Sequence, residues 1–94
     1  MRKGRVVFTY QNPAVRRVTL VASFTLWNRH GPEFTEEAPG VWTLSIPAPP
    51  PGRYAYKFML DGGEMVPDPE NGFQIPDGIS FPIQYNSVLV VPRP

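Results

Sequence analysis

The sequence predicts an all-β protein, an immunoglobulin-like sandwich of about seven short antiparallel strands in a single domain spanning residues 1–94. Short runs alternate between apolar and polar side chains with the two-residue period of a strand. The 13 prolines and eight glycines of this 94-residue chain gather between those runs, as expected for turns and loops. No window of useful length shows the 3.6-residue apolar period of a helix, so we expect little or no helix.

Five runs are expected to form strands, because their apolar and polar residues alternate and they are rich in β-branched or aromatic residues. They are GRVVFTY (4–10), RVTLVASF (17–24), GVWTLSIP (40–47), RYAYKFML (53–60) and NSVLVV (86–91).

Within these runs, the alternation indicates which side chains face the core. Val6, Phe8 and Tyr10 share one face of the first run, and Trp42 is expected in the core with the third. In the fourth run, Tyr54, Tyr56 and Phe58 form a row that we expect to line the core. Lys57 lies between them in sequence and therefore faces the opposite way.

The segments between the strands also contain sequences typical of turns and loops. LDGGEM (60–65) predicts a tight hairpin after the fourth run, because Asp-Gly and Gly-Gly sequences accept positive φ angles. The segment 66–85 is expected to be rich in loops, with one short irregular strand.

Composition argues against several classes of function. With a net charge of +1, the chain offers no electrostatic reason to bind nucleic acid or an anionic membrane. No stretch approaches the ~20 apolar residues of a membrane span, and the short N-terminal MRKG leaves no room for a signal peptide, so we expect a cytoplasmic protein. No cysteine is present and His30 is the only histidine, so we expect neither a metal site nor a cofactor.

Catalysis has little support in the sequence. A glycosidase needs two carboxyl groups held roughly 5 to 9.5 Å apart. The paired acidic residues here, Glu36 with Glu37 and Asp68 with Glu70, fall in loops rich in proline and glycine, where we expect solvated carboxylates. We therefore predict no catalytic residue and no enzymatic activity for this chain by itself.

Two motifs in the expected order give the chain a resemblance to a known family. SFTLWN (23–28) resembles S-F-N-x-W, and YAYKFMLDG (54–62) resembles Y-x-Y-K-F-x-V-D-G, both of the family 48 carbohydrate-binding module. That family includes the glycogen-binding domain of the AMP-activated protein kinase β subunit and the N-terminal early-set domains of branching and debranching enzymes. The resemblance covers about Arg5 to Val91. It implies an early-set fold and a non-catalytic role, at most as an accessory domain of a glycoside hydrolase or branching enzyme.

The resemblance also implies a ligand and site residues. Glycogen-binding members hold an α-1,4-glucan, such as glycogen, starch or a maltooligosaccharide, on two tryptophans, while a lysine and an asparagine hydrogen-bond its hydroxyl groups. Carried over by motif, the first tryptophan is Trp27, the lysine is Lys57 and the asparagine is Asn86.

The second tryptophan of the family pattern D-G-x-W-x-x-D-P is missing. This chain reads DGGEMVPDP (61–69), with Glu64 and Met65 in its place. Met65 can offer a polarizable apolar contact instead. The aromatic residues that could replace the missing wall are Phe73, Phe81 and Tyr85.

Two functions stay open on the sequence alone. The first is α-glucan binding through the residues named above. The second is a structural or protein-interaction sandwich that packs against a catalytic domain or a kinase-like partner, with weak or lost sugar binding. In that second case Trp27 caps one end of the sandwich, Lys57 is an ordinary solvated lysine, and Asn86 bonds to the local backbone.

Overall fold

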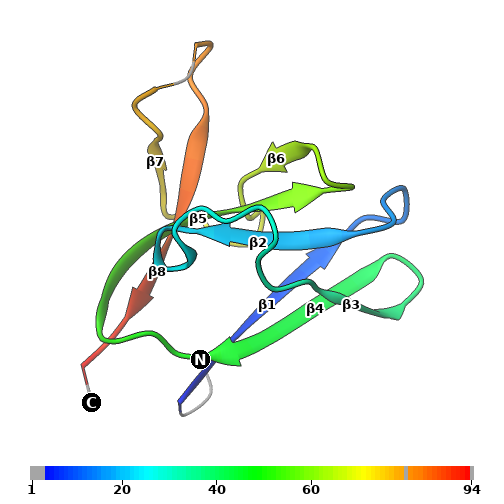
Figure 1. Cartoon of the computed structure of the whole chain (residues 1–94), viewed down its shortest axis with the longest axis horizontal. Helices are drawn as coiled ribbons and strands as arrows, with labels where there is room; N and C mark the ends of the chain where they lie inside the picture. The colour runs from blue at the N-terminus through cyan, green and yellow to red at the C-terminus, as the bar shows by residue number, and fades with distance from the viewer. Residues whose placement is uncertain (1–3, 80, 94) are drawn as a thin grey trace.

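The computed structural model describes residues 4–79 and 81–93, which form two antiparallel β-sheets packed face to face and one short 3-10 turn (Figure 1). This confirms the predicted all-β, immunoglobulin-like sandwich. The elements in chain order are β1 (Arg5–Gln11), β2 (Val18–Ala22), η1 (Ser23–Thr25), β3 (Thr35–Ala38), β4 (Val41–Pro47), β5 (Gly52–Leu60), β6 (Glu64–Val66), β7 (Gln74–Pro76) and β8 (Tyr85–Val91).

Strand β5 organises the larger sheet. Sheet A has the order β1-β4-β3, and sheet B has the order β2-β5-β8-β7. One edge of β5 pairs with β2, whereas its other edge pairs first with β8 and then, from Phe58 to Leu60, with β6. Strands β8 and β6 thus follow one another along the same edge of β5, and Figure 1 shows the β7–β8 hairpin standing away from the body of the sandwich.

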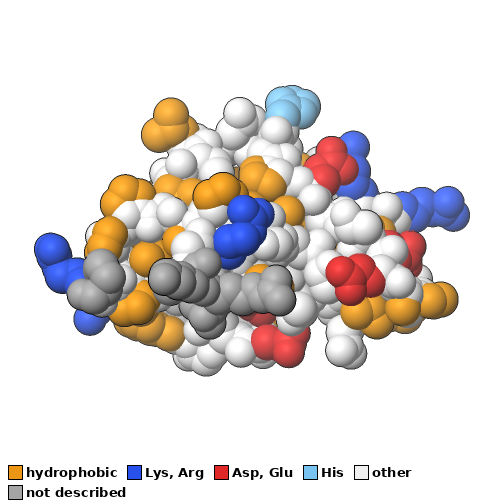
Figure 2. Space-filling view, turned by 90° about the horizontal axis from the view of Figure 1, so that it is seen from below, with side chains coloured by type: hydrophobic (Ala, Val, Ile, Leu, Met, Phe, Trp, Pro, Cys, Tyr) orange, Lys and Arg blue, Asp and Glu red, His pale blue; other side chains and the backbone are white. Residues whose placement is uncertain are grey.

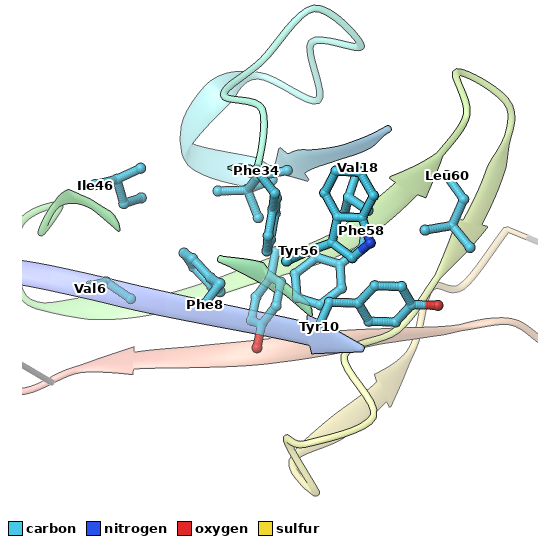
Figure 3. Close-up of a cluster of buried hydrophobic side chains, with 12 residues drawn as sticks. Val6, Phe8, Tyr10, Val18, Phe34, Ile46, Tyr56, Phe58 and Leu60 are labelled. Carbon is cyan, nitrogen blue, oxygen red and sulfur yellow. The ribbon is translucent and has the colours of Figure 1, made fainter. Parts of the chain in front are cut away.

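The core between the sheets is aromatic (Figure 3). Phe58 is fully buried, and its ring lies 5.0 Å from the Phe34 ring and 5.5 Å from the Tyr10 ring, centroid to centroid. Tilted and edge-to-face contacts of this kind are favourable for aromatic quadrupoles. The predicted core positions Tyr56 and Trp42 are buried.

The hairpin after β5 forms as predicted. Asp61 and Gly62 have φ angles of 52° and 76°, and β6 returns along β5 with Met65 opposite Met59. The end of the second strand differs from the expectation. The strand predicted over 17–24 ends at Ala22, because the chain leaves the sheet through η1, where Ser23 Oγ accepts a hydrogen bond from the Ala55 backbone N–H.

Strand β3 was not predicted. Its sequence, TEEA, is exposed throughout and has poor strand propensity. It is held as an edge strand by pairing with β4 and by side-chain bonds: Glu36 Oε2 accepts from the Gly40 N–H and Glu37 Oε1 accepts from Thr43 Oγ1. Tertiary pairing therefore overrides the local preference.

The prediction that Asp68 is a solvated loop carboxylate is wrong. Asp68 is buried, and its Oδ2 accepts a 2.7 Å hydrogen bond from the Tyr56 hydroxyl. Its backbone N–H donates to Ser87 Oγ, and Asn71 Nδ2 donates to both the Tyr56 hydroxyl and the Val88 carbonyl. This network ties the segment after β6 to β5 and β8, so the carboxylate has a structural role. Glu36, Glu37 and Glu70 are exposed, as expected.

Replacing Tyr56 with phenylalanine is expected to change both stability and its pH dependence. Burial, reinforced by the Asp68 carboxylate, raises the pKa of the Tyr56 hydroxyl well above its ordinary value of about 10. Since the folded-state pKa is the higher one, this contribution to stability is complete below about pH 10 and is lost as the pH rises toward the folded-state pKa. Tyr56→Phe is expected to cost about 1 to 2 kcal/mol at neutral pH and to lessen the alkaline loss of stability.

Urea unfolding of both proteins from pH 7 to about pH 11 checks this expectation. The free energy of unfolding of the wild type is expected to fall more steeply above about pH 10 than that of Tyr56→Phe. Parallel curves for the two proteins would show that this hydroxyl does not couple folding to proton release.

Candidate functional site

A hollow of about 290 Å³ opens on the outer face of sheet B, the face turned away from the core. Four of the five residues proposed from the sequence line it together with two that were not proposed. The lining residues are Trp27, Lys57, Met65, Asp77, Ile79 and Asn86. Tyr85, the fifth candidate, does not line the hollow; it precedes Asn86 on β8, and strand alternation turns its side chain to the opposite face.

Strand register brings the outward side chains together. Tyr56 of β5 and Ser87 of β8 are paired and both buried. Because the strands are antiparallel, Lys57, which follows Tyr56, lies beside Asn86, which precedes Ser87, and strand alternation turns both side chains outward. Met65 of β6 stands opposite Met59, two residues further along β5 on the same face. Three strands distant in sequence thus supply one surface.

Trp27 reaches this surface through an unusual backbone. After η1, the N–H of Leu26 donates to the Ser23 carbonyl and the N–H of Trp27 donates to the Ala22 carbonyl. Leu26 and Trp27 have φ angles of 56° and 57°, in the left-handed region that ordinary L-residues avoid. The Trp27 side chain is 43% exposed, and its indole N–H donates to no residue in the described part of the chain. The indole ring and its N–H group are therefore accessible to a ligand.

Replacing Leu26 with asparagine is expected to stabilise the protein by about 1 kcal/mol. Leucine is strained at positive φ, whereas asparagine adopts this conformation at lower cost. Leu26 is 88% exposed, so little buried apolar area is lost. Urea unfolding checks the expectation, with Ile83→Asn as the matched control, since Ile83 is exposed but has no positive φ. A gain in the control equal to that of Leu26→Asn would count against backbone strain as the cause.

Lys57 and Asp77 form a partly buried ion pair at the hollow. The Lys57 Nζ lies 3.6 Å from Asp77 Oδ2, and the two side chains are only 13% and 9% exposed. Asp77 is itself fixed, because its Oδ1 accepts from the Ile79 N–H and its backbone N–H donates to the Gln84 carbonyl. Lys57 is therefore a positioned cation and not an ordinary solvated lysine.

Sequence reasoning missed Asp77 and Ile79. Both lie in the connection after β7, and the pairing of β7 with β8 carries that connection back toward Lys57. The sequence IPDG (75–78) has the composition of a turn and carries no motif of a binding site. The available signal was a turn that carries a carboxylate. The distance between that carboxylate and Lys57, however, depends on how β7 and β5 are each paired with β8.

The hollow combines apolar surface with hydrogen-bonding groups. Trp27, Met65 and Ile79 supply the apolar part, while Lys57, Asp77 and Asn86 supply donors and acceptors. Such a surface suits a ligand with apolar faces and hydroxyl groups around its edge. Within residues 4–79 and 81–93, no cluster of His, Asp or Glu could hold a metal ion, and no helix is long and apolar enough to cross a membrane.

One face of the molecule shows no strong electrostatic field of a single sign (Figure 2). On the face drawn in Figure 2, basic and acidic side chains are interspersed among apolar ones. This agrees with the small net charge and gives no support to recognition of a polyanion.

Comparison with known proteins identifies the family. Residues 1–73 match the sequence profile of carbohydrate-binding module 48 (isoamylase N-terminal domain). A solved structure with the name "Putative alpha Amylase from Salmonella typhimurium" shares 25% sequence identity and a TM-score of 0.67, over 93% of this chain and 13% of that one. A search of curated proteins gave no match.

The family match has a boundary that bears on the site. It includes Trp27, Lys57 and Met65 but ends before Asp77, Ile79 and Asn86, which join the hollow through the pairing of β7 and β8. The match nonetheless spans most of the sequence and both motifs noted above. The chain belongs to the carbohydrate-binding module 48 family.

Proposed function

We propose that this chain is a non-catalytic module that binds α-1,4-glucans, such as glycogen, starch or maltooligosaccharides. The observation that carries the proposal is the meeting of Trp27, Lys57 and Asn86 in one hollow, in a member of a carbohydrate-binding family. These residues come from a loop and two strands: the register of β5 and β8 places Lys57 beside Asn86, and the backbone after η1 brings Trp27 to the same hollow.

Stacking supplies the main attraction. The faces of a glucose ring carry C–H groups, and an exposed indole can cover one of them, with burial of apolar area at roughly 25 cal/mol per Å². Trp27 provides that surface, and Met65 and Ile79 flank it. One such contact contributes about 1 to 2 kcal/mol, so a few contacts together give a dissociation constant on the order of 0.1 mM.

Hydrogen bonding supplies orientation. The ammonium group of Lys57 has three donors, the Asp77 carboxylate accepts, and the Asn86 amide does both. Asp77 has two roles in this proposal, because it holds Lys57 in place and can accept from a sugar hydroxyl.

The missing second tryptophan limits the affinity. Met65 takes part in the hollow, but among the residues that the structure describes, Trp27 is the only aromatic one that lines it. A thioether stacks over less area than an indole. We therefore expect weaker binding than two indoles would give.

Affinity electrophoresis in gels containing glycogen or amylopectin tests the proposal. The wild type is expected to be retarded, and maltoheptaose is expected to change its tryptophan fluorescence. Trp42 is only 4% exposed and lies in the core, so a fluorescence change would report on Trp27. Unretarded migration together with unchanged fluorescence would overturn glucan binding.

A second candidate function is packing against a protein partner, such as the catalytic domain of a larger enzyme. The observation that favours it is the exposed apolar surface of the β7–β8 connection, where Phe81 is 98% exposed. The similarity to a small part of a longer solved chain is in keeping with an accessory role. Loss of glucan binding with retention of a stable complex would favour this candidate over the first.

A further inference from the structure

A second hollow of about 290 Å³ also lies on sheet B. Its lining residues are Arg53, Tyr54, Ala55, Phe73, Ile75 and Val88. It shares no lining residue with the Trp27 hollow, and of its lining residues only Phe73 was considered for sugar binding from the sequence.

Strand register places the two hollows next to each other on one face. Ile75, which lines the second hollow, is paired with Asn86, which lines the first. Ala55 and Val88 are paired with each other and lie two residues along from Lys57 and Asn86, on the same side of the sheet. Ile75 lies in the same cross-strand row as Asn86, and at about 3.3 Å per residue along β5, Ala55 lies about 7 Å and Arg53 about 13 Å from Lys57.

The second hollow repeats the chemistry of the first, an aromatic ring beside a cation. Phe73 is 43% exposed, and the guanidinium carbon of Arg53 lies 5.8 Å from the centre of its ring. The guanidinium group has five N–H donors and makes no hydrogen bond or ion pair with any residue of the described chain. It is held beside the ring by the cation–π contact and keeps its donors for a ligand.

We propose that Phe73 and Arg53 form a second subsite that takes the glucosyl units of the same α-1,4-glucan extending beyond the Trp27 hollow. The inference rests on the proposed glucan binding and adds a direction and a minimum ligand length to it. The occupant is a continuous glucan because the two hollows adjoin on one sheet face and each offers an aromatic ring together with a cation whose N–H groups can donate to sugar hydroxyls. A short oligosaccharide fills the first hollow alone, whereas a longer one spans both.

Titration calorimetry with maltotriose and maltoheptaose tests the subsite. The wild type is expected to bind maltoheptaose about tenfold more tightly than maltotriose. Phe73→Ala is expected to bring this ratio close to one without changing the affinity for maltotriose, and Arg53→Ala to lower the ratio about threefold. Val7→Ala is the matched control, because Val7 is similarly exposed but lies on sheet A, and it is expected to keep the wild-type ratio.

The outcomes separate the subsite from the function on which it rests. Unchanged maltotriose affinity in Phe73→Ala would show that the variant is folded, so the lost length preference would belong to the subsite. A wild-type ratio near one, or a ratio retained in Phe73→Ala, would overturn the subsite while glucan binding stands. Absence of binding of either sugar to the wild type would overturn both.

Discussion

Replacing Trp27 with alanine is expected to weaken maltoheptaose binding by at least about tenfold. Among the described residues that line the Trp27 hollow, the indole is the only aromatic surface, so its removal takes away the stacking contact. A loss of about 1.4 kcal/mol corresponds to a tenfold change in affinity. Because Trp27 is 43% exposed and lies outside the core cluster, we expect a cost in stability of no more than about 1 to 2 kcal/mol. Calorimetry and urea unfolding measure the two effects separately.

Trp27→Phe is the matched control for that prediction. Phenylalanine keeps an aromatic face, and we expect it to retain affinity within about threefold of the wild type. Wild-type affinity in Trp27→Ala would contradict a stacking role. Unfolding of Trp27→Ala would instead support the alternative that this residue caps one end of the sandwich.

Replacing Phe58 with alanine is expected to lower the free energy of unfolding by about 3 to 5 kcal/mol. Phe58 is fully buried, and four other aromatic rings surround it, from Phe8, Tyr10, Phe34 and Tyr56. These rings come from β1, from β5 itself and from the residue preceding β3, so the cavity would open where the two sheets meet. Domains of this size are stable by about 5 to 15 kcal/mol, so the loss is a large fraction of the total.

Guanidinium unfolding monitored by circular dichroism measures this loss, with Phe73→Ala as the matched control. Phe73 is an exposed phenylalanine of the same chain, and we expect its truncation to cost less than about 1 kcal/mol. Similar losses in the two variants would show that Phe58 is not the centre of the core. Glucan binding by Phe58→Ala is expected to fall with its folded fraction, because the neighbouring Lys57 depends on β5 for its position.

The strands with strong alternation could be predicted from the sequence. Val6, Phe8 and Tyr10 alternate with exposed residues along β1, and Tyr56 and Phe58 alternate with Lys57 along β5. Because alternate side chains of these strands face the buried core, the two-residue period of apolar residues can be read from each strand's own sequence. Glu36 and Glu37 lie in β3 although their local sequence disfavours a strand, because the partner strand β4 supplies the hydrogen bonds.

The site was predictable only in part. The two motifs located Trp27 and Lys57. The left-handed backbone at Leu26 could not be predicted, because leucine ordinarily avoids that conformation. Asp77 could not be assigned to Lys57, since their separation depends on the register of β7 against β8 and of β8 against β5. Burial of Asp68 was missed for a similar reason, because its partner Tyr56 lies on a different strand.

Chemical shift mapping of the labelled protein with maltoheptaose tests glucan binding at the outer face of sheet B most directly. We expect the largest changes at the Trp27 indole N–H, the Asn86 side-chain amide, the Met65 methyl group and the backbone N–H of Lys57. On the outer face of sheet A, Val7 and Thr43 line a separate hollow, and their signals are expected to stay in place. Unchanged signals at Trp27, Lys57 and Asn86, or changes confined to sheet A, would contradict the proposed site.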